Sequence, residues 1–227
     1  LPDLYSQGAT VIVNICGSTI DEYVEITRIL ADADGVNAIE LNISCPNIKA
    51  GGITFGNSAV GTSEVVQAVR SVTKLPIIPK LTPNVTDIAG IARAAEEAGA
   101  DAVSLVNTFL AMAIDVETRR PALSNGVGGL SGPAIRPIAV RMVYECSQAV
   151  TIPIIGMGGI MTARDVLEFI IAGATAVQVG TANFVNPNLW PKLLADLKEY
   201  LSRHNIERVQ DLVGTLELTE TQVWNSS

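Results

Sequence analysis

Three helix-to-strand turns in this chain repeat one design, and this repetition constrains the fold more than any other feature. In each turn a glycine (Gly35, Gly99 or Gly173) follows a predicted helix, at a position where a left-handed C-cap favours glycine. A short apolar strand then begins, as in ADGVNAIELN, EAGADAVSLVN and IAGATAVQVG. Helices and buried strands that alternate in this way predict an α/β fold with a parallel sheet.

The same alternation extends along the rest of the chain. Short, β-branched and almost continuously apolar runs, typical of strands buried on both faces, occur at 10–15, 38–43, 76–81, 102–107, 153–156 and 176–180. Helices are expected at 20–33, 63–71, 87–98, 132–147 and 163–172, and near 188–203 and 205–214. Thr19 or Asp21, Thr86 and Thr162 are the predicted N-caps, and Thr162 with Asp165 resembles a capping box.

The number of βα units bears on the architecture. Six units can be counted, whereas a TIM barrel, (β/α)8, contains eight. Asn186 and Pro187 mark a helix start after the last unit, which predicts a complete C-terminal end. We therefore expect a TIM barrel whose first two strands are missing, formed by residues 1–216 and followed by a polar tail at 217–227.

Composition excludes several classes of function. The chain has 227 residues, 48% of them apolar, and a formal net charge of −8, which argues against nucleic acid or an anionic membrane as a partner. No apolar run approaches the roughly 20 residues of a membrane-spanning helix, and no signal peptide is evident. Three scattered cysteines do not make a disulfide framework, which favours a reducing, cytoplasmic location. With His204 as the single histidine, no metal site is expected.

The segment NAIELNISCPN, residues 37–47, carries the most chemistry. A buried strand runs directly into a loop with Asn42, Ser44, Cys45 and Asn47. Two asparagine amides can bind a planar ring whose edge alternates C=O and N–H groups, and a cysteine can accept a proton once it is a thiolate. A plain strand end with a buried structural cysteine would have the same sequence pattern, so the segment alone does not distinguish a ring-binding site from a structural strand end.

Polar residues or glycines end nearly every predicted strand, at the edge where TIM barrels build their active sites. The last two ends predict a phosphate site, because Gly158 and Gly159 in GMGGI leave backbone N–H groups accessible before a helix start. Gly180 and Thr181 follow one βα unit later. Tight packing turns are the alternative explanation for these glycines.

Lys80 ends the apolar run PIIPKL. Lysine is rarely buried without a partner, so an ion pair with Glu40 is one explanation. A cation beside the electron-rich end of a reduced flavin is the other. The connection after Thr108 is far longer than a usual βα loop, and we expect its first part to form a hairpin over the barrel mouth.

Motifs along most of the chain resemble those of the dihydroorotate dehydrogenases, FMN enzymes built on a TIM barrel. They are VNICGS, ELNISCPN, PKLTPNVTDI, SLVNT, DVETRRP, GVGGLSGPAIRP, GMGGI and VQVGTA. The run from DVETRRPAL to VRMVYE resembles the NAD-linked class, class 1B, in particular. That class pairs the FMN barrel with a second subunit that carries FAD and a 2Fe-2S cluster.

The resemblance implies roles for individual residues. The catalytic base would be Cys45, at a place where the membrane-associated class of the family carries serine. The substrate would be bound by Asn42, Asn47, Asn107 and Thr108. The FMN would be bound by Asn14, Asn42, Lys80, Val106, Gly132, Gly158, Gly159, Gly180 and Thr181.

The implied activity is the oxidation of dihydroorotate to orotate in pyrimidine synthesis. Cys45 would remove the C5 proton while hydride leaves C6, and electrons would reach NAD through the partner subunit of a homodimeric catalytic core. Two alternatives remain. One is an FMN barrel reductase like the pyrimidine-reducing domain of dihydropyrimidine dehydrogenase, against which Asn47 argues. The other is a truncated, non-catalytic chain that binds phosphate or flavin.

Overall fold

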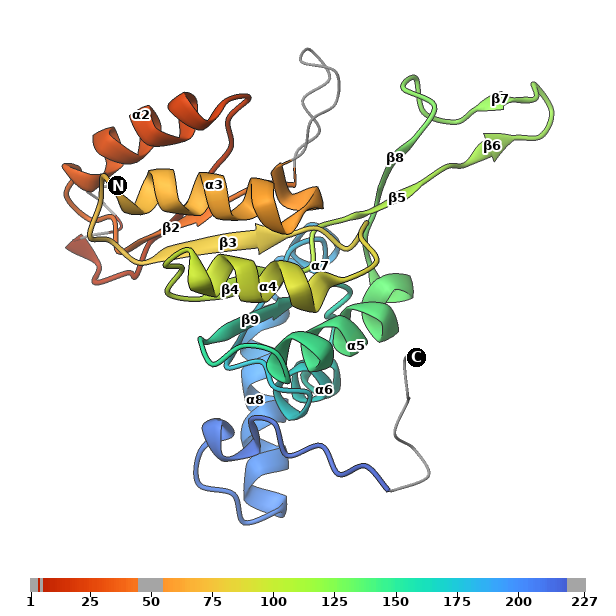
Figure 1. Ribbon diagram of the computed structural model, residues 1–227. Helices are drawn as coiled ribbons and strands as arrows, with labels where there is room; N and C mark the ends of the chain where they lie inside the picture. The colour runs from red at the N-terminus through yellow and green to blue at the C-terminus, as the bar shows by residue number, and fades with distance from the viewer. Residues whose placement is uncertain (1–3, 5, 45–54, 220–227) are drawn as a thin grey trace.

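The computed structural model describes residue 4 and residues 6–44 and 55–219, and its largest feature is a six-stranded parallel sheet (Figure 1). The strand order is β1-β2-β3-β4-β9-β10, so each main strand lies beside the next one along the chain. The strands are β1 (Ile12–Ile15), β2 (Ala38–Leu41), β3 (Ile77–Leu81), β4 (Val103–Leu105), β9 (Ile154–Met157) and β10 (Ala176–Gln178). All six predicted strands are confirmed, five of them with shorter bounds and β9 shifted by one residue.

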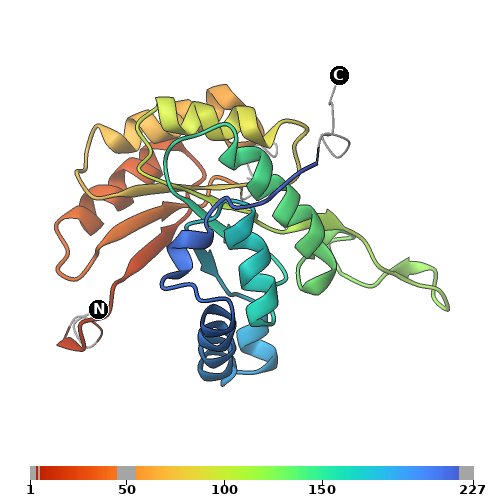
Figure 2. The same ribbon diagram turned by 90° about the horizontal axis from the view of Figure 1, so that it is seen from below.

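Helices alternate with these strands and cover the sheet (Figure 2). They are α2 (Ile20–Ala31), α3 (Ala59–Arg70), α4 (Ile88–Glu97), α5 (Arg136–Ser147), α6 (Ala163–Ile171), α7 (Ala182–Val185) and α8 (Leu189–Arg203). Short 3-10 helices lie at η2 (Phe55–Asn57), η3 (Pro133–Ile135) and η4 (Val209–Leu212). This is the arrangement of six consecutive units of a TIM barrel, as the sequence predicts. None of the helices in the described ranges is long and apolar enough to cross a membrane.

The helix caps confirm part of the prediction. Thr19 caps α2, and Thr162 forms a capping box with Asp165 at the start of α6. The prediction of Thr86 for α4 was wrong, because the Asp87 carboxylate accepts from the Gly90 N–H at 2.7 Å. An aspartate is at least as good an N-cap as threonine.

The predicted helix at 205–214 was also wrong, since only the 3-10 helix η4 forms there. Asn205 has a φ of +54° and ends α8 in a left-handed cap, with the Ile206 N–H donating to the Leu201 carbonyl at 2.9 Å. Gly214, at φ +69°, ends the segment on its other side. Between these two turns the chain forms the short 3-10 helix η4 in place of a continuous α-helix.

The two faces of the sheet differ, and this difference positions the site. Alternate strand residues point to opposite faces, and large apolar side chains such as Ile39, Leu41 and Val103 belong to the main core with the helices. The other face carries a separate small cluster, formed by Ala38, Ile78, Ala102 and Ile155. Two residues further along β2, β3 and β4, the same face becomes polar, with Glu40, Lys80 and Ser104.

A long two-stranded arm follows β4. Its base pairs β5 (Phe109–Ala111) with β8 (Gly128–Leu130), and its tip pairs β6 (Ile114–Asp115) with β7 (Arg120–Pro121), all antiparallel. The predicted hairpin is therefore present, but it projects away from the body instead of covering the barrel mouth (Figure 1). The antiparallel pairing satisfies the backbone groups that face each other across the arm.

Candidate active site

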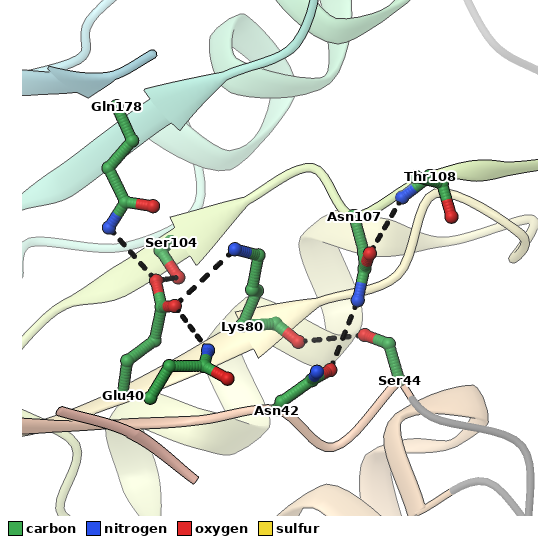
Figure 3. Close-up of polar contacts among 9 residues, drawn as sticks. Glu40, Asn42, Ser44, Lys80, Ser104, Asn107, Thr108 and Gln178 are labelled. Atoms are coloured by element: carbon green, nitrogen blue, oxygen red, sulfur yellow. Dashed lines mark hydrogen bonds and ion pairs between the residues drawn. The ribbon is translucent and has the colours of Figure 1, made fainter. Parts of the chain in front are cut away.

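A buried carboxylate, Glu40 on β2, lies at the centre of the polar side chains on one face of the sheet, the face opposite the main core (Figure 3). Its oxygens accept hydrogen bonds from Asn14 Nδ2 at 2.5 Å and Ser104 Oγ at 2.7 Å. Gln178 Nε2 donates at 3.0 Å, and the Lys80 ammonium lies at 3.4 Å. The four donors come from β1, β4, β10 and β3, so one side chain joins five of the six main strands.

These contacts keep Glu40 charged. Burial alone would raise its pKa, but the positive charge of Lys80 and three side-chain hydrogen bonds outweigh that effect. The pKa of Glu40 therefore lies below its ordinary value, and the carboxylate is ionised at neutral pH. The ion pair of Lys80 with Glu40, one of the two explanations that the sequence left open, is present.

A second polar group lies at the carboxyl ends of β2 and β4 (Figure 3). Asn107 Nδ2 donates to Asn42 Oδ1 at 3.1 Å, and the Thr108 N–H donates to Asn107 Oδ1 at 2.8 Å. Tyr23 holds the backbone of Asn42 through a 2.7 Å hydrogen bond from its hydroxyl. The two predicted asparagines are thus in contact, and their amide orientations are fixed by neighbours.

The strand end just before the predicted base is also anchored. Ser44 Oγ donates to the Lys80 carbonyl at 2.9 Å, which ties the end of β2 to β3. Cys45 and Asn47, the predicted base and substrate residue, lie outside the described residues. The other two cysteines are Cys16, which is exposed, and Cys146, whose thiol pKa burial raises to about 12.

A pocket of about 200 Å³ lies over the carboxyl ends of β3, β4, β9 and β10. The predicted site residues among those lining it are Lys80, Val106, Asn107, Thr108, Gly132, Gly158, Gly159, Gly180 and Thr181. Asn14 and Asn42 do not line it. Asn14 reaches the lining residue Lys80 through Glu40, and Asn42 contacts the lining residue Asn107 directly.

The glycines of GMGGI form a cradle in which a side chain cannot be placed freely. Gly158 and Gly159 have φ values of +129° and +76°. A Cβ on Gly159 would come within 2.6 Å of the Gly132 carbonyl oxygen. On the other side of the pocket, Thr181 Oγ1 donates to Ser131 Oγ at 2.9 Å. Backbone N–H groups that meet beside a helix start suit a phosphate group.

The start of α6 beside this cradle is held by a buried carboxylate. Asp165 accepts from the N–H groups of Met161 at 2.9 Å and Thr162 at 2.8 Å, and pairs with Arg136 from α5. The first turns of α5 and α6 are therefore joined beside the glycine cradle.

We expect Gly159→Ala to weaken FMN binding by about tenfold to 100-fold, because strain at a positive φ costs roughly 1–3 kcal/mol and the methyl group displaces the Gly132 carbonyl. Fluorescence titration of the flavin-free protein measures the affinity, and riboflavin, which has no phosphate, should be affected less. Gly214→Ala is the matched control, because its φ is +69° and a Cβ there would meet no atom within 4 Å. Equal FMN affinity for Gly159→Ala and the parent protein would show that the cradle does not bind phosphate.

From the sequence, Glu40 was predicted only as a partner of Lys80, and Ser104, Gln178 and Ser131 were not predicted as site residues. A signal was present, because Glu40, Ser104 and Gln178 each interrupt an apolar strand with one polar residue. Their convergence depends on the strand register, in which Asn14 pairs with Glu40 and Lys80 with Ser104. That register is not visible in the sequence.

Comparison with known proteins identifies the family. The family described as dihydroorotate dehydrogenase matches residues 3–201. A relative from Phocaeicola vulgatus is 54% identical over 217 residues, which are 96% of this chain and 72% of the relative. One from Desulforudis audaxviator is 57% identical over 219 residues, 96% of this chain and 71% of the relative.

A third relative, from Geobacillus kaustophilus, is 54% identical over 214 residues, 94% of this chain and 68% of the relative. All three are named dihydroorotate dehydrogenase B (NAD(+)), catalytic subunit. The barrel strands, the polar strand ends and these matches agree, and the chain belongs to the dihydroorotate dehydrogenase family.

Proposed function

We propose that this protein is the FMN-binding catalytic subunit of a NAD-linked dihydroorotate dehydrogenase, which oxidises dihydroorotate to orotate in pyrimidine synthesis. One observation carries the proposal: a single pocket combines the glycine cradle, the Lys80 ammonium and the Asn107 amide. The glycine cradle suits a phosphate group, the Lys80 ammonium suits a flavin ring, and the Asn107 amide suits a polar heterocycle. Family membership and the names of the relatives support the same activity.

The phosphate end of FMN fits the cradle. The backbone N–H groups of Gly158 and Gly159, with Gly180 and Thr181 across the pocket, would hold the phosphate, and the positive end of the α6 dipole would favour its charge. Lys80 lines the same pocket and would place its ammonium beside the flavin ring. When bound, FMN supplies the acceptor for the hydride that leaves C6 of dihydroorotate.

The substrate end rests on the asparagine pair. The Asn42 and Asn107 side chains offer both N–H donors and a carbonyl acceptor, as the alternating edge of dihydroorotate requires. Their contact with each other and the Thr108 N–H set the amide orientations before substrate arrives. Such preorganisation reduces the entropy lost when the reacting groups are aligned.

Proton removal is assigned to Cys45, which follows Ser44 directly in the sequence. As a thiolate, Cys45 would take the C5 proton, and the C5–C6 double bond of orotate would form as the hydride leaves C6. The hydrogen bond from Ser44 to the Lys80 carbonyl supports this assignment, because it ties the end of β2 to Lys80, the residue that would contact FMN.

The electrons must then leave the flavin. The relatives are named catalytic subunits, which supports a partner subunit for this chain as well. We assign to that partner the FAD and the 2Fe-2S cluster that pass electrons to NAD, with a homodimer of this chain at the core and a cytoplasmic location.

The choice of substrate is the direct test. With the FMN-bound protein and an artificial electron acceptor, we expect dihydroorotate to be oxidised at least about 100-fold faster than dihydrouracil, since a site built to bind the substrate's polar groups rejects an analogue that lacks one. The two compounds differ by the carboxylate of dihydroorotate. A preference for dihydrouracil would instead support a reductase of the dihydropyrimidine dehydrogenase kind.

A further inference from the structure

Glu40 occupies an unusual place in the site, because it touches the residues of the pocket without lining the pocket itself. Its side chain is 5% exposed, whereas that of its partner Lys80 is 18% exposed. Lys80 and Gln178 line the pocket, and both contact Glu40 from the pocket side. Any effect that Glu40 has on a molecule in the pocket through contacts, as opposed to its charge acting through space, therefore passes through these two residues.

The distances show which contacts hold the carboxylate. Ser104 and Asn14 donate at 2.7 Å and 2.5 Å, while the Lys80 ammonium lies farther away, at 3.4 Å. Uncharged donors from β1 and β4 thus fix the position of the negative charge, and the ammonium is drawn toward it. An ammonium carries three N–H donors, so one can face Glu40 while others face the pocket.

No other charge competes for this role within the described part of the chain. Lys80 is the single charged side chain there that contacts Glu40, and the remaining contacts come from the neutral groups of Asn14, Ser104 and Gln178. A long, flexible lysine side chain without its carboxylate could extend toward solvent, because it is already partly exposed. The carboxylate is therefore what localises the cation.

We propose that Glu40 is a positioning residue that fixes the Lys80 ammonium and the Gln178 amide beside the flavin ring. The negative charge that the ring gains on reduction then meets a cation that is already in place, and no reorganisation is needed. This inference rests on the proposed function insofar as FMN occupies the pocket. It adds a residue that touches neither substrate nor flavin.

Two effects of removing the Glu40 charge have opposite signs, which makes the inference testable. Through space, loss of a negative charge near the flavin would favour the reduced, anionic ring and raise the flavin midpoint potential. Loss of positioning would let the Lys80 ammonium move away, which would lower the potential and slow reduction. The sign of the change therefore separates a positioning role from a simple nearby charge.

The test is Glu40→Gln in the FMN-bound protein, with the midpoint potential measured in the absence of substrate. We expect the potential to fall and flavin reduction by dihydroorotate to slow by about tenfold to 100-fold, as small misplacements of catalytic groups do. For the two-electron couple, each tenfold change in equilibrium constant corresponds to about 30 mV. An unchanged or raised potential would overturn the proposal.

Two comparisons complete the experiment. Glu96→Gln is the matched control, because Glu96 also accepts several hydrogen bonds, from Thr151 and Ile152, but lies outside the pocket lining; it should leave the potential unchanged. In a Lys80→Met background, Glu40→Gln should no longer lower the potential, because no ammonium remains to be positioned. A fall of the same size in both backgrounds would contradict the inference.

Thermal melting and FMN content show whether each variant folds. If Glu40→Gln does not fold, Glu40→Asp replaces it, since it keeps the charge and withdraws it by one methylene. If Glu40→Asp slows flavin reduction in protein that keeps Lys80 but not in the Lys80→Met variant, the result supports positioning. Equal slowing with and without Lys80 overturns it. Failure of the proposed function would be distinct, because the parent protein would then lack FMN or would not be reduced by dihydroorotate.

Discussion

Replacement of Cys45 by serine is expected to lower dihydroorotate turnover at pH 7 by about 10²–10⁴-fold, the usual contribution of a general base. A serine hydroxyl holds its proton far more tightly than a thiol, so it is a poor base at this pH. FMN should stay bound, because the cradle and Lys80 are unchanged. Steady-state rates together with flavin absorbance of the purified variant measure both quantities.

The other two cysteines provide the controls for this experiment. Cys16→Ser should be nearly silent, because Cys16 is exposed at the end of β1 and lines no part of the pocket. Cys146 is buried, with its thiol pKa raised to about 12, so alkylating reagents should not modify it in the folded protein. Unchanged turnover in Cys45→Ser would exclude Cys45 as the base.

Lys80→Met is expected to slow flavin reduction by about 10²–10³-fold, as loss of one preorganised charge-stabilising group does. FMN affinity should change much less. The negative charge that Lys80 stabilises develops only as hydride is transferred, and interactions made chiefly in the transition state affect the rate of chemistry more than binding. Anaerobic stopped-flow mixing with dihydroorotate separates the reduction rate from the dissociation constant.

The control for this variant is Lys192→Met on α8, where the lysine pairs with Asp196 four residues later on the helix surface. That variant should reduce at the parental rate, since exposed ion pairs contribute little. Parental reduction kinetics in Lys80→Met would leave Lys80 with a structural role only, as the partner of Glu40.

The parts of the fold that local chemistry determines were predictable from the sequence. Glycines after helices and short apolar runs located all six main strands, because both signals depend on neighbouring residues alone. The cradle glycines were predictable for the same reason: a positive φ, as at Gly159, selects for glycine directly. Thr162 and Asp165 likewise form a capping box within one helical turn.

Features that depend on distant contacts could not be predicted in the same way. The role of Glu40 requires the register of five strands, and its bond from Gln178 spans 138 residues along the chain. The direction of the arm depends on how its base leaves β4, which no local motif specifies. At α4 the prediction failed between two adjacent capping residues, Thr86 and Asp87, both of which are chemically suitable.

Anaerobic mixing of the FMN-bound protein with a slight excess of dihydroorotate, without any electron acceptor, tests most directly whether the pocket holds FMN and whether the protein transfers a hydride to it from dihydroorotate. We predict that the flavin absorbance bleaches and that one orotate forms for each FMN reduced. Orotate formation without bleaching, or a flavin that stays oxidised in the presence of dihydroorotate, would contradict it.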